Sequence, residues 1–273
     1  MSTPTPAESS STIIPKPDRG GSPPPEGLLN VACPPAVQSG GWWQPFAAFD
    51  GVAVLHVDLA PDALNEQRAW AWLDPAERQR ADQFRHGGAK RQYVLCRSAL
   101  RSLLCDALSC RNEQLAFRAS KHGKPSAFVG GSKSAFGFNV SHGGRHGLIA
   151  LAPDGTVGVD VEERSAPRNL DVLVDTVLSP GERAEVMAAA GDEKLRLFLN
   201  LWTMKEALSK ARGVGMSMDV SGFEIPHGML RGTRGGVFCF PDVPDLTWAL
   251  HNVGTDDFAA AVACTTQAVC DAS

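Results

Sequence analysis

The amino-acid sequence predicts an α+β fold whose two halves share a similar order of elements. In each half, segments rich in β-branched residues flank a run of amphipathic helical segments. Runs of helices between strands are typical of antiparallel sheets rather than of a parallel sheet. No repeat of fixed period is visible, so the likeness of the halves rests on element order alone.

Composition and charge narrow the class of protein. The chain has 273 residues and 43% hydrophobic content, enough to build a buried core. A net charge of -4 predicts no general attraction to nucleic acid, so any bound anion needs a local basic cluster. The seven cysteines include no CxxC pair, and no apolar run reaches the length of a membrane helix. We therefore expect reduced thiols, a cytoplasmic location and no contact with a membrane.

The composition also predicts domain boundaries. Residues 1–28 are rich in Ser, Thr, Pro and Gly, which predicts a disordered tail. Residues 29–51 are expected to form a loosely packed arm around Trp42, Trp43 and Phe46. Residues 52–154 and 155–273 are expected to form an N-terminal and a C-terminal subdomain, with a ligand cleft between them.

In the first half, β-branched residues predict a strand over 52–60, and Asp74-Pro75 predicts the start of a helix. Gly123-Lys124-Pro125 predicts a loop. The expected elements in order are a strand over 52–60, helices over 63–73, from 74 onward and over 89–107, and strands over 135–141 and 146–152.

The second half repeats this order of elements. It begins with a strand over 156–163, with Val157, Val159 and Val161 alternating on one face. The further expected elements are helices over 170–178, 180–189 and 193–211, and strands near 223, over 237–240, over 246–251 and over 258–264.

Two carboxylates stand out on the predicted strand that reads "VGVDVEE". Asp160 and Glu162 are two residues apart, so they project to the same face of the strand. Adjacent carboxylates repel each other, and a hard divalent ion such as Mg²⁺ would remove that cost. The alternative is an acidic strand end that faces solvent.

The segment "LWTMKEALSK" adds a third carboxylate, Glu206, beside Lys205 and Lys210. Mg²⁺ combines carboxylates with substrate phosphates, and lysines can neutralise the remaining phosphate charge. On its own, however, a Glu-Lys pair four residues apart is also an ordinary ion pair on a helix surface.

The segments "SKHGKPSAF" and "FNVSHGGRHG" supply donors for an anion. Lys121, Lys124, Ser141, His142 and Arg145 lie among glycines that let the backbone approach a ligand closely. For His142 alone, a structural hydrogen bond is favoured over phosphate contact, and the neighbouring Ser, Gly and Arg residues narrow that difference.

Taken together, "GKP", "FNVSH", "GVDVE" and "WTMKEALSK" follow one another within about 90 residues, and this order closely resembles the Sfp-type 4'-phosphopantetheinyl transferases. The resemblance covers 52–264. It implies two similar subdomains related by a pseudo-twofold axis, with the active site in the cleft between them. It also implies transfer of 4'-phosphopantetheine from coenzyme A to a serine of an apo acyl or peptidyl carrier protein, with release of adenosine 3',5'-bisphosphate. Such a protein would act as a monomer and serve polyketide, nonribosomal peptide or fatty-acid assembly.

The resemblance also implies roles for individual residues. Asp160, Glu162 and Glu206 would hold Mg²⁺, and Glu206 and Lys210 would be catalytic, with Glu206 as the general base. Residues expected to contact coenzyme A are Arg80, Arg91, Lys124, Pro125, Ser141, His142, Asp160, Lys205 and Lys210.

Two other functions are considered beside this one. A coenzyme A-binding regulatory protein would keep the pocket without transfer activity. Another Mg²⁺-dependent phosphotransferase is disfavoured, because the sequence contains no GxxxxGK[ST] loop and no kinase HRD and DFG pair. A carrier surface could lie near 172–177 or at Met216 and Met218, although ordinary packing also explains these residues.

Overall fold

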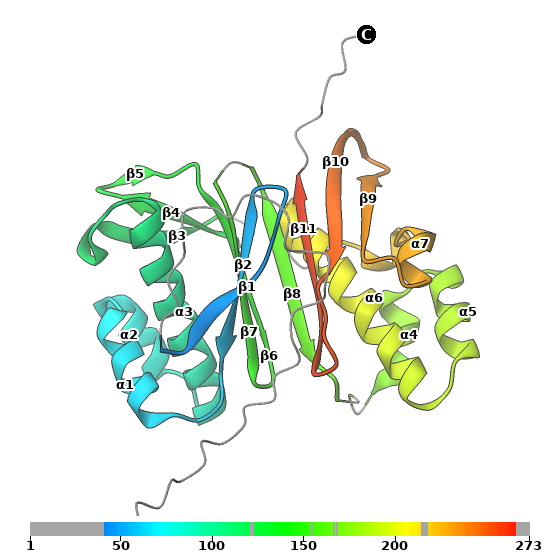
Figure 1. The fold of residues 1–273 in the computed structure, drawn as a ribbon, viewed down its shortest axis with the longest axis horizontal. Helices are drawn as coiled ribbons and strands as arrows, with labels where there is room; N and C mark the ends of the chain where they lie inside the picture. Colours follow the sequence, from blue (N-terminus) through cyan, green and yellow to red (C-terminus); the bar gives the residue numbers. More distant parts are fainter. Residues whose placement is uncertain are drawn as a thin grey trace, which may run out of the picture.

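The computed structural model describes residues 41–120, 123–153, 155–165, 167, 169–213 and 218–265. Two four-stranded sheets lie in the middle of the molecule, and helices cover their outer sides (Figure 1). The predicted α+β class is confirmed. The predicted tail over 1–28 lies outside the described residues, and within these residues no helix combines the length and apolar character needed to cross a membrane.

The first sheet is antiparallel and has the strand order β1-β2-β7-β6. Its strands are β1 (Trp43–Phe49), β2 (Val52–Asp58), β6 (Gly137–Gly143) and β7 (His146–Ala152). Asp50 and Gly51 both have positive φ, and they close the β1–β2 hairpin with the two-residue turn that Asp-Gly pairs favour. Trp42 and Trp43 are buried, so the prediction of a loosely packed arm is wrong for residues 41–51.

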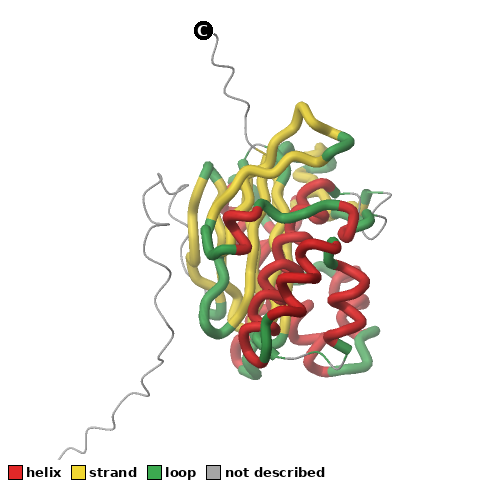
Figure 2. Tube along the Cα trace, turned by 90° about the vertical axis from the view of Figure 1, so that its right-hand side faces the viewer, coloured by secondary structure: helices red, strands yellow, loops and turns green. Residues whose placement is uncertain are grey.

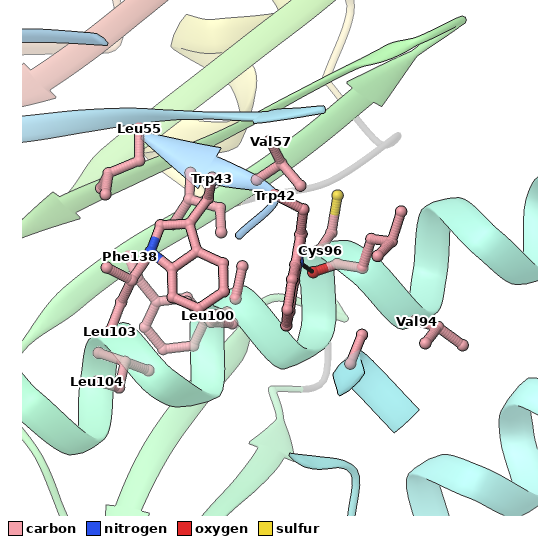
Figure 3. Packing of buried hydrophobic residues seen from close by; sticks show 14 of the residues in the cluster. Trp42, Trp43, Leu55, Val57, Val94, Cys96, Leu100, Leu103, Leu104 and Phe138 are labelled. Atoms are coloured by element: carbon pink, nitrogen blue, oxygen red, sulfur yellow. Dashed lines mark hydrogen bonds between the residues drawn. The ribbon is translucent and has the colours of Figure 1, made fainter. Parts of the chain in front are cut away.

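Three helices cover the outer face of this sheet: α1 (Ala63–Trp72), α2 (Pro75–Asp82) and α3 (Gly87–Ala107). The Asp62 and Asp74 side chains accept hydrogen bonds from backbone N–H groups in the first turns of α1 and α2. The two tryptophan side chains insert between the sheet and α3, where the Trp42 indole N–H donates to the Leu95 carbonyl at 3.1 Å (Figure 3). This packing explains why β1 belongs to the N-terminal core.

A small sheet joins α3 to β6, and the sequence patterns did not reveal it. It contains β3 (Leu115–Ala119), β4 (Pro125–Val129) and β5 (Ser132–Lys133), and the short helix η1 (Asn112–Gln114) precedes it. These strands are short. Most of their residues are partly buried or exposed, and they show little hydrophobic alternation. They carry Pro125 at the edge of the candidate site.

The second sheet is also antiparallel, with the order β8-β11-β10-β9. Its strands are β8 (Val157–Glu163), β9 (Gly235–Phe240), β10 (Val243–Asn252) and β11 (Phe258–Thr265). The helices of this half are α4 (Leu170–Val177), α5 (Pro180–Ala188), α6 (Gly191–Arg212), η3 (Val220–Gly222) and α7 (His227–Leu230). Figure 2 faces this side of the molecule and shows the helices lying over the strands. The strand predicted near Phe223 is wrong, because this residue follows η3 in a loop that is buried against the core.

The two sheets pack face to face through a third apolar core. Val52, Val54 and Leu148 of the first sheet meet Val159 and Val262 of the second in this layer. Side chains from both sheets are therefore buried on both faces, which explains the nearly continuous apolar runs in β7 and β11.

Helix α6 lies directly on β8 and β11. Gly158 of β8 permits this approach, because a Cβ atom built there would overlap the Ala207 carbonyl oxygen and the Ala211 backbone nitrogen. The close contact aligns one face of α6 with the polar end of β8.

Candidate functional site

The candidate site forms where β6 of the first sheet lies beside β8 of the second. The Asn139 amide oxygen accepts a hydrogen bond from the Val159 backbone N–H at 2.9 Å, which ties the two strands together. Further along these strands, the Ser141 hydroxyl of β6 donates to Asp160 Oδ1 of β8 at 2.7 Å. Residues from both halves therefore meet at one carboxylate.

Asp160 is the centre of this arrangement. Its side chain is only 5% exposed, and Oδ1 also accepts from Lys210 Nζ at 2.5 Å. Lys210 Nζ donates to the Ser141 hydroxyl as well, at 3.0 Å. Among the described residues, the other oxygen, Oδ2, is buried without a hydrogen-bond partner. A buried carboxylate oxygen without a donor carries a desolvation cost that a bound cation would remove.

Glu206 and Lys210 are four residues apart on α6, so they share the face that meets β8. Burial, followed by the nearby Asp160 charge, raises the pKa of Glu206, and the Lys210 ammonium partly opposes this. Burial and then Asp160 also raise the pKa of Glu162. The three carboxylates thus lie close enough to repel one another, as expected for ligands that share a cation.

The chemistry of these side chains fits a hard divalent ion, because such ions prefer carboxylate oxygens. One of these oxygens, Asp160 Oδ2, is buried and has no hydrogen-bond partner among the described residues. In this conformation the Lys210 ammonium contacts Asp160, and no three His, Cys, Asp or Glu side chains of the described ranges converge closely enough to hold an ion. Metal binding would therefore require these carboxylate side chains to move closer together.

Trp202 also belongs to this site, a role that was not predicted from the sequence. Its indole N–H donates to Glu162 Oε1 at 3.2 Å. The signal was available, because Trp202, Glu206 and Lys210 follow one another at spacings of four on the same helix. Gly143 also borders Glu162, since a Cβ atom there would lie 3.3 Å from Glu162 Oε2.

His142 follows Ser141 on β6, and its ring is exposed at the edge of the site. Desolvation by the surrounding groups lowers the pKa of His142, and the Lys210 ammonium lowers it further. The imidazole at the rim can donate or accept a hydrogen bond, and its phosphate contact stays a prediction.

Lys124 and Pro125 line a cavity of about 410 Å³ between the small sheet and the end of α6. The Lys124 ammonium donates to the carbonyls of Val157, Lys210 and Ala211 at 3.2, 2.8 and 3.1 Å. Burial lowers its pKa to about 8. Lys124 thus caps the carbonyl end of α6, and its predicted ligand contact would use its stem or require these bonds to break.

Lys205 is placed differently from the prediction that it faces a pyrophosphate. Its side chain is fully buried on the other side of α6 and forms an ion pair with Glu182 at 2.8 Å. Its ammonium also donates to the carbonyls of Val220 and Phe223 at 2.7 and 2.5 Å. The expectation for Lys205 is wrong, because these partners satisfy all three of its donors away from the site.

Arg80 and Arg91 are not brought to Asp160 by any contact within the described residues. The exposed Arg80 guanidinium of α2 lies over the Tyr93 ring at 5.4 Å. Arg91 of α3 donates to the Leu59 carbonyl at 2.9 Å. Their coenzyme A contacts stay predictions, and Lys121 lies outside the described residues.

The geometry defines a polar site built on two antiparallel sheets, with buried carboxylates and an ammonium group at a junction of the two halves. Two family models match the chain across these halves. One, described as the 4'-phosphopantetheinyl transferase superfamily, matches residues 156–263, and the other, described as 4'-phosphopantetheinyl transferase, N-terminal, matches residues 60–154. Together they span well over half of the sequence, so the chain belongs to the 4'-phosphopantetheinyl transferase superfamily.

Individual relatives agree with this family. The chain is 36% identical to 4'-phosphopantetheinyl transferase AcpT of Escherichia coli O157:H7 over 52% of this chain and 66% of that protein. It is 34% identical to slr0495 of Synechocystis sp., provisionally named for the same activity, over 54% of this chain and 59% of that protein. It is 25% identical to 4'-phosphopantetheinyl transferase Sfp of Bacillus subtilis over 63% of this chain and 74% of that protein. The match thus spans less than two thirds of the length of the first two relatives named.

Proposed function

We propose that this chain transfers the 4'-phosphopantetheine arm of coenzyme A to a serine of an apo acyl or peptidyl carrier protein. The main support for the proposal is the environment of the Asp160 carboxylate. One of its oxygens accepts hydrogen bonds from Ser141 and Lys210, and the second oxygen is buried without a donor among the described residues. Membership of the superfamily supplies the reaction class. A binding protein without transfer activity would not need buried carboxylates beside its phosphate-binding groups.

Asp160, Glu162 and Glu206 would hold Mg²⁺, since they are the carboxylates at the junction of β8 and α6. When bound there, Mg²⁺ would neutralise charge on the pyrophosphate of coenzyme A. The raised pKa values of Glu162 and Glu206 support the assignment, because burial and then the neighbouring carboxylate charge disfavour their ionised forms, and a bound cation would stabilise those forms.

In the transfer step, the carrier serine oxygen attacks the β-phosphorus of coenzyme A, and the bond from this phosphorus to the bridging oxygen breaks. Adenosine 3',5'-bisphosphate leaves with the electrons of that bond. Glu206 is the candidate that accepts the serine proton, because its carboxylate lies on α6 beside Asp160 and Lys210, where the nucleophile would meet the phosphate. Lys210 can exchange its contact with Asp160 for the phosphate oxygens, where it offsets the growing charge of the leaving group.

The remaining coenzyme A contacts belong to the same proposal. Ser141 and His142 would meet the phosphate region, since Ser141 already contacts both Asp160 and Lys210. Pro125 and the stem of Lys124 would border the nucleotide in the cavity between the small sheet and α6. Arg80 and Arg91 would contact the 3'-phosphate. Lys205 has no part in this set.

We further propose that the two halves are related by a pseudo-twofold axis and that the chain acts as a cytoplasmic monomer of the Sfp type. Each half has a four-stranded antiparallel sheet covered by a long helix, α3 or α6. One chain supplies both sides of the site. The carriers would be those of polyketide, nonribosomal peptide or fatty-acid assembly. Val172 of α4, 62% exposed, is a candidate for the carrier surface, whereas Met218 packs against the C-terminal core and Met216 lies outside the described residues.

The experiment is to incubate the protein with coenzyme A, Mg²⁺ and a panel of apo carrier proteins, and to look by mass spectrometry for the added arm. The expected result is a mass gain on the carrier serine that Asp160→Asn and Glu206→Gln each abolish while their circular dichroism and melting stay close to wild type. Asp242→Asn is the matched control, because this carboxylate is 61% exposed and lies on the β9–β10 turn. Coenzyme A binding without a mass gain on any carrier would favour the regulatory protein instead.

A further inference from the structure

The C-terminal end of α3 carries two cysteines that the proposed reaction does not use. The helix ends at Ala107, and Ser109 has φ +48°, the left-handed conformation that non-glycine residues seldom adopt. The Cys110 backbone N–H donates to the Cys105 carbonyl at 3.0 Å, and the Ser109 N–H donates to the Asp106 carbonyl at 3.3 Å. These bonds are the 6→1 and 5→2 bonds of a Schellman motif.

A Schellman motif brings the side chain that follows the left-handed residue against a side chain in the last helical turn. In this chain both of these side chains are thiols, those of Cys110 and Cys105, and they are within hydrogen-bonding contact. The helix end therefore places the two thiols beside each other. Both thiols are free in this structure.

The two thiols differ in access. Cys105 belongs to the N-terminal core and is 7% exposed, whereas Cys110 is partly exposed and packs against the edge of that core. Burial, followed by the neighbouring Cys110, raises the pKa of Cys105 to about 12. Cys110 is thus the thiol that an oxidant in solution reaches first, and Cys105 is the partner placed to react with it.

We propose that Cys105 and Cys110 form a reversible oxidation site that a hydroperoxide closes to a disulfide. In the first step, Cys110 Sγ loses its proton and attacks hydrogen peroxide, the O–O bond breaks, and one water leaves with a sulfenic acid on Cys110. In the second step, Cys105 Sγ attacks Cys110 Sγ, the S–O bond breaks, and the departing hydroxide takes the Cys105 proton to form the second water. Two thiols are oxidised and one peroxide is reduced.

The fold indicates what the closed form would change. The disulfide would bridge the end of α3 to the segment that enters η1, and it would hold Ser109 in its left-handed conformation. Asn112 of η1 accepts from the buried Arg101 side chain at 2.7 Å, so this segment is already tied to the core. We expect the oxidised protein to melt at a higher temperature, because the cross-link removes freedom from the unfolded chain.

The sequence makes the site simple to test. Trypsin cleaves after Arg101 and Arg111, so both cysteines fall in the single peptide 102–111. The folded full-length protein is treated with hydrogen peroxide, quenched with iodoacetamide and digested. The expected peptide is lighter by two hydrogen atoms and carries no alkyl group, and dithiothreitol before quenching restores two alkylated thiols.

Variants and a reference thiol sharpen the test. Cys105→Ala leaves Cys110 without a partner, so dimedone should trap its sulfenic acid in the variant but not in the wild-type chain. Cys239 is exposed and serves as the internal measure of oxidant dose. If Cys239 is oxidised while both thiols of 102–111 stay alkylatable, or if dimedone labels wild-type Cys110 in place of closure, the proposal is overturned. Equal closure rates in the folded and the guanidinium-unfolded chain would also overturn it, because the Schellman motif would then contribute nothing.

Discussion

Replacement of Lys205 by methionine tests whether this lysine has a structural role or binds phosphate. In wild type, its ammonium is fully buried, pairs with Glu182 at 2.8 Å and donates to two backbone carbonyls of the segment that follows α6. Lys205→Met keeps the apolar stem and removes only the charge and the donors. We therefore expect a loss of stability rather than a specific loss of coenzyme A binding.

The size of the stability loss follows from the buried Glu182 carboxylate that Lys205→Met leaves without its cation. The Glu182 side chain is 1% exposed and would stay buried without its cation, although the N–H groups of Ser179 and Ile225 still donate to it at 3.0 and 2.8 Å. Removing one partner of a buried ion pair costs about 3–5 kcal/mol. In a chain of this size, 1 kcal/mol corresponds to about 2–4 °C, so the melting temperature should fall by about 10 °C.

Thermal and urea unfolding give the stability, and transfer assays at several coenzyme A concentrations give KM. The double variant Lys205→Met/Glu182→Gln should recover a large part of the lost stability, because it no longer buries an unpaired charge. Lys194→Met is the control on the same helix, since its partner Asp171 is 79% exposed, and it should change stability by less than about 1 kcal/mol. A Lys205→Met protein that is as stable as wild type but has a tenfold higher KM for coenzyme A would refute this reasoning.

Three further predictions concern the site and the core. Trp202→Phe removes the donor to Glu162 Oε1 and should raise the Mg²⁺ concentration for half-maximal transfer by about tenfold; an unchanged Mg²⁺ requirement would contradict the positioning role. Gly158→Ala should destabilise the fold by about 2 kcal/mol or more in urea unfolding, because its Cβ atom would push α6 off β8, while Gly87→Ala, which meets no atom within 4 Å, should not. Burial lowers the pKa of His56 to about 4, so below pH 6.5 the unfolded chain binds more protons and stability should fall as the pH drops from about 6.5 to 4, by up to about 3 kcal/mol. His56→Gln should flatten that part of the stability profile, and a slope that survives this substitution would assign it to other groups.

Much of the fold could be predicted from local patterns. The helices that became α1, α3 and α6 and the strands that became β2, β7, β8 and β11 carry clear periodicity or runs of β-branched residues. The short strands β3, β4 and β5 escaped detection because a few residues at a partly exposed edge show no reliable alternation. The strand predicted near Phe223 failed because an apolar residue is equally compatible with a buried loop.

The sequence by itself determined which residue types could carry the chemistry and which of them share a helix face. Glu206 and Lys210 are about 40° apart around α6, so their common direction follows from helix geometry. Only the tertiary structure decided which face of α6 meets β8, and so it placed Lys210 on Asp160 and Lys205 on Glu182. The physical reason is that helix periodicity fixes how the side chains of one helix point relative to one another. The residues that each side chain contacts depend on packing between elements that are distant in sequence.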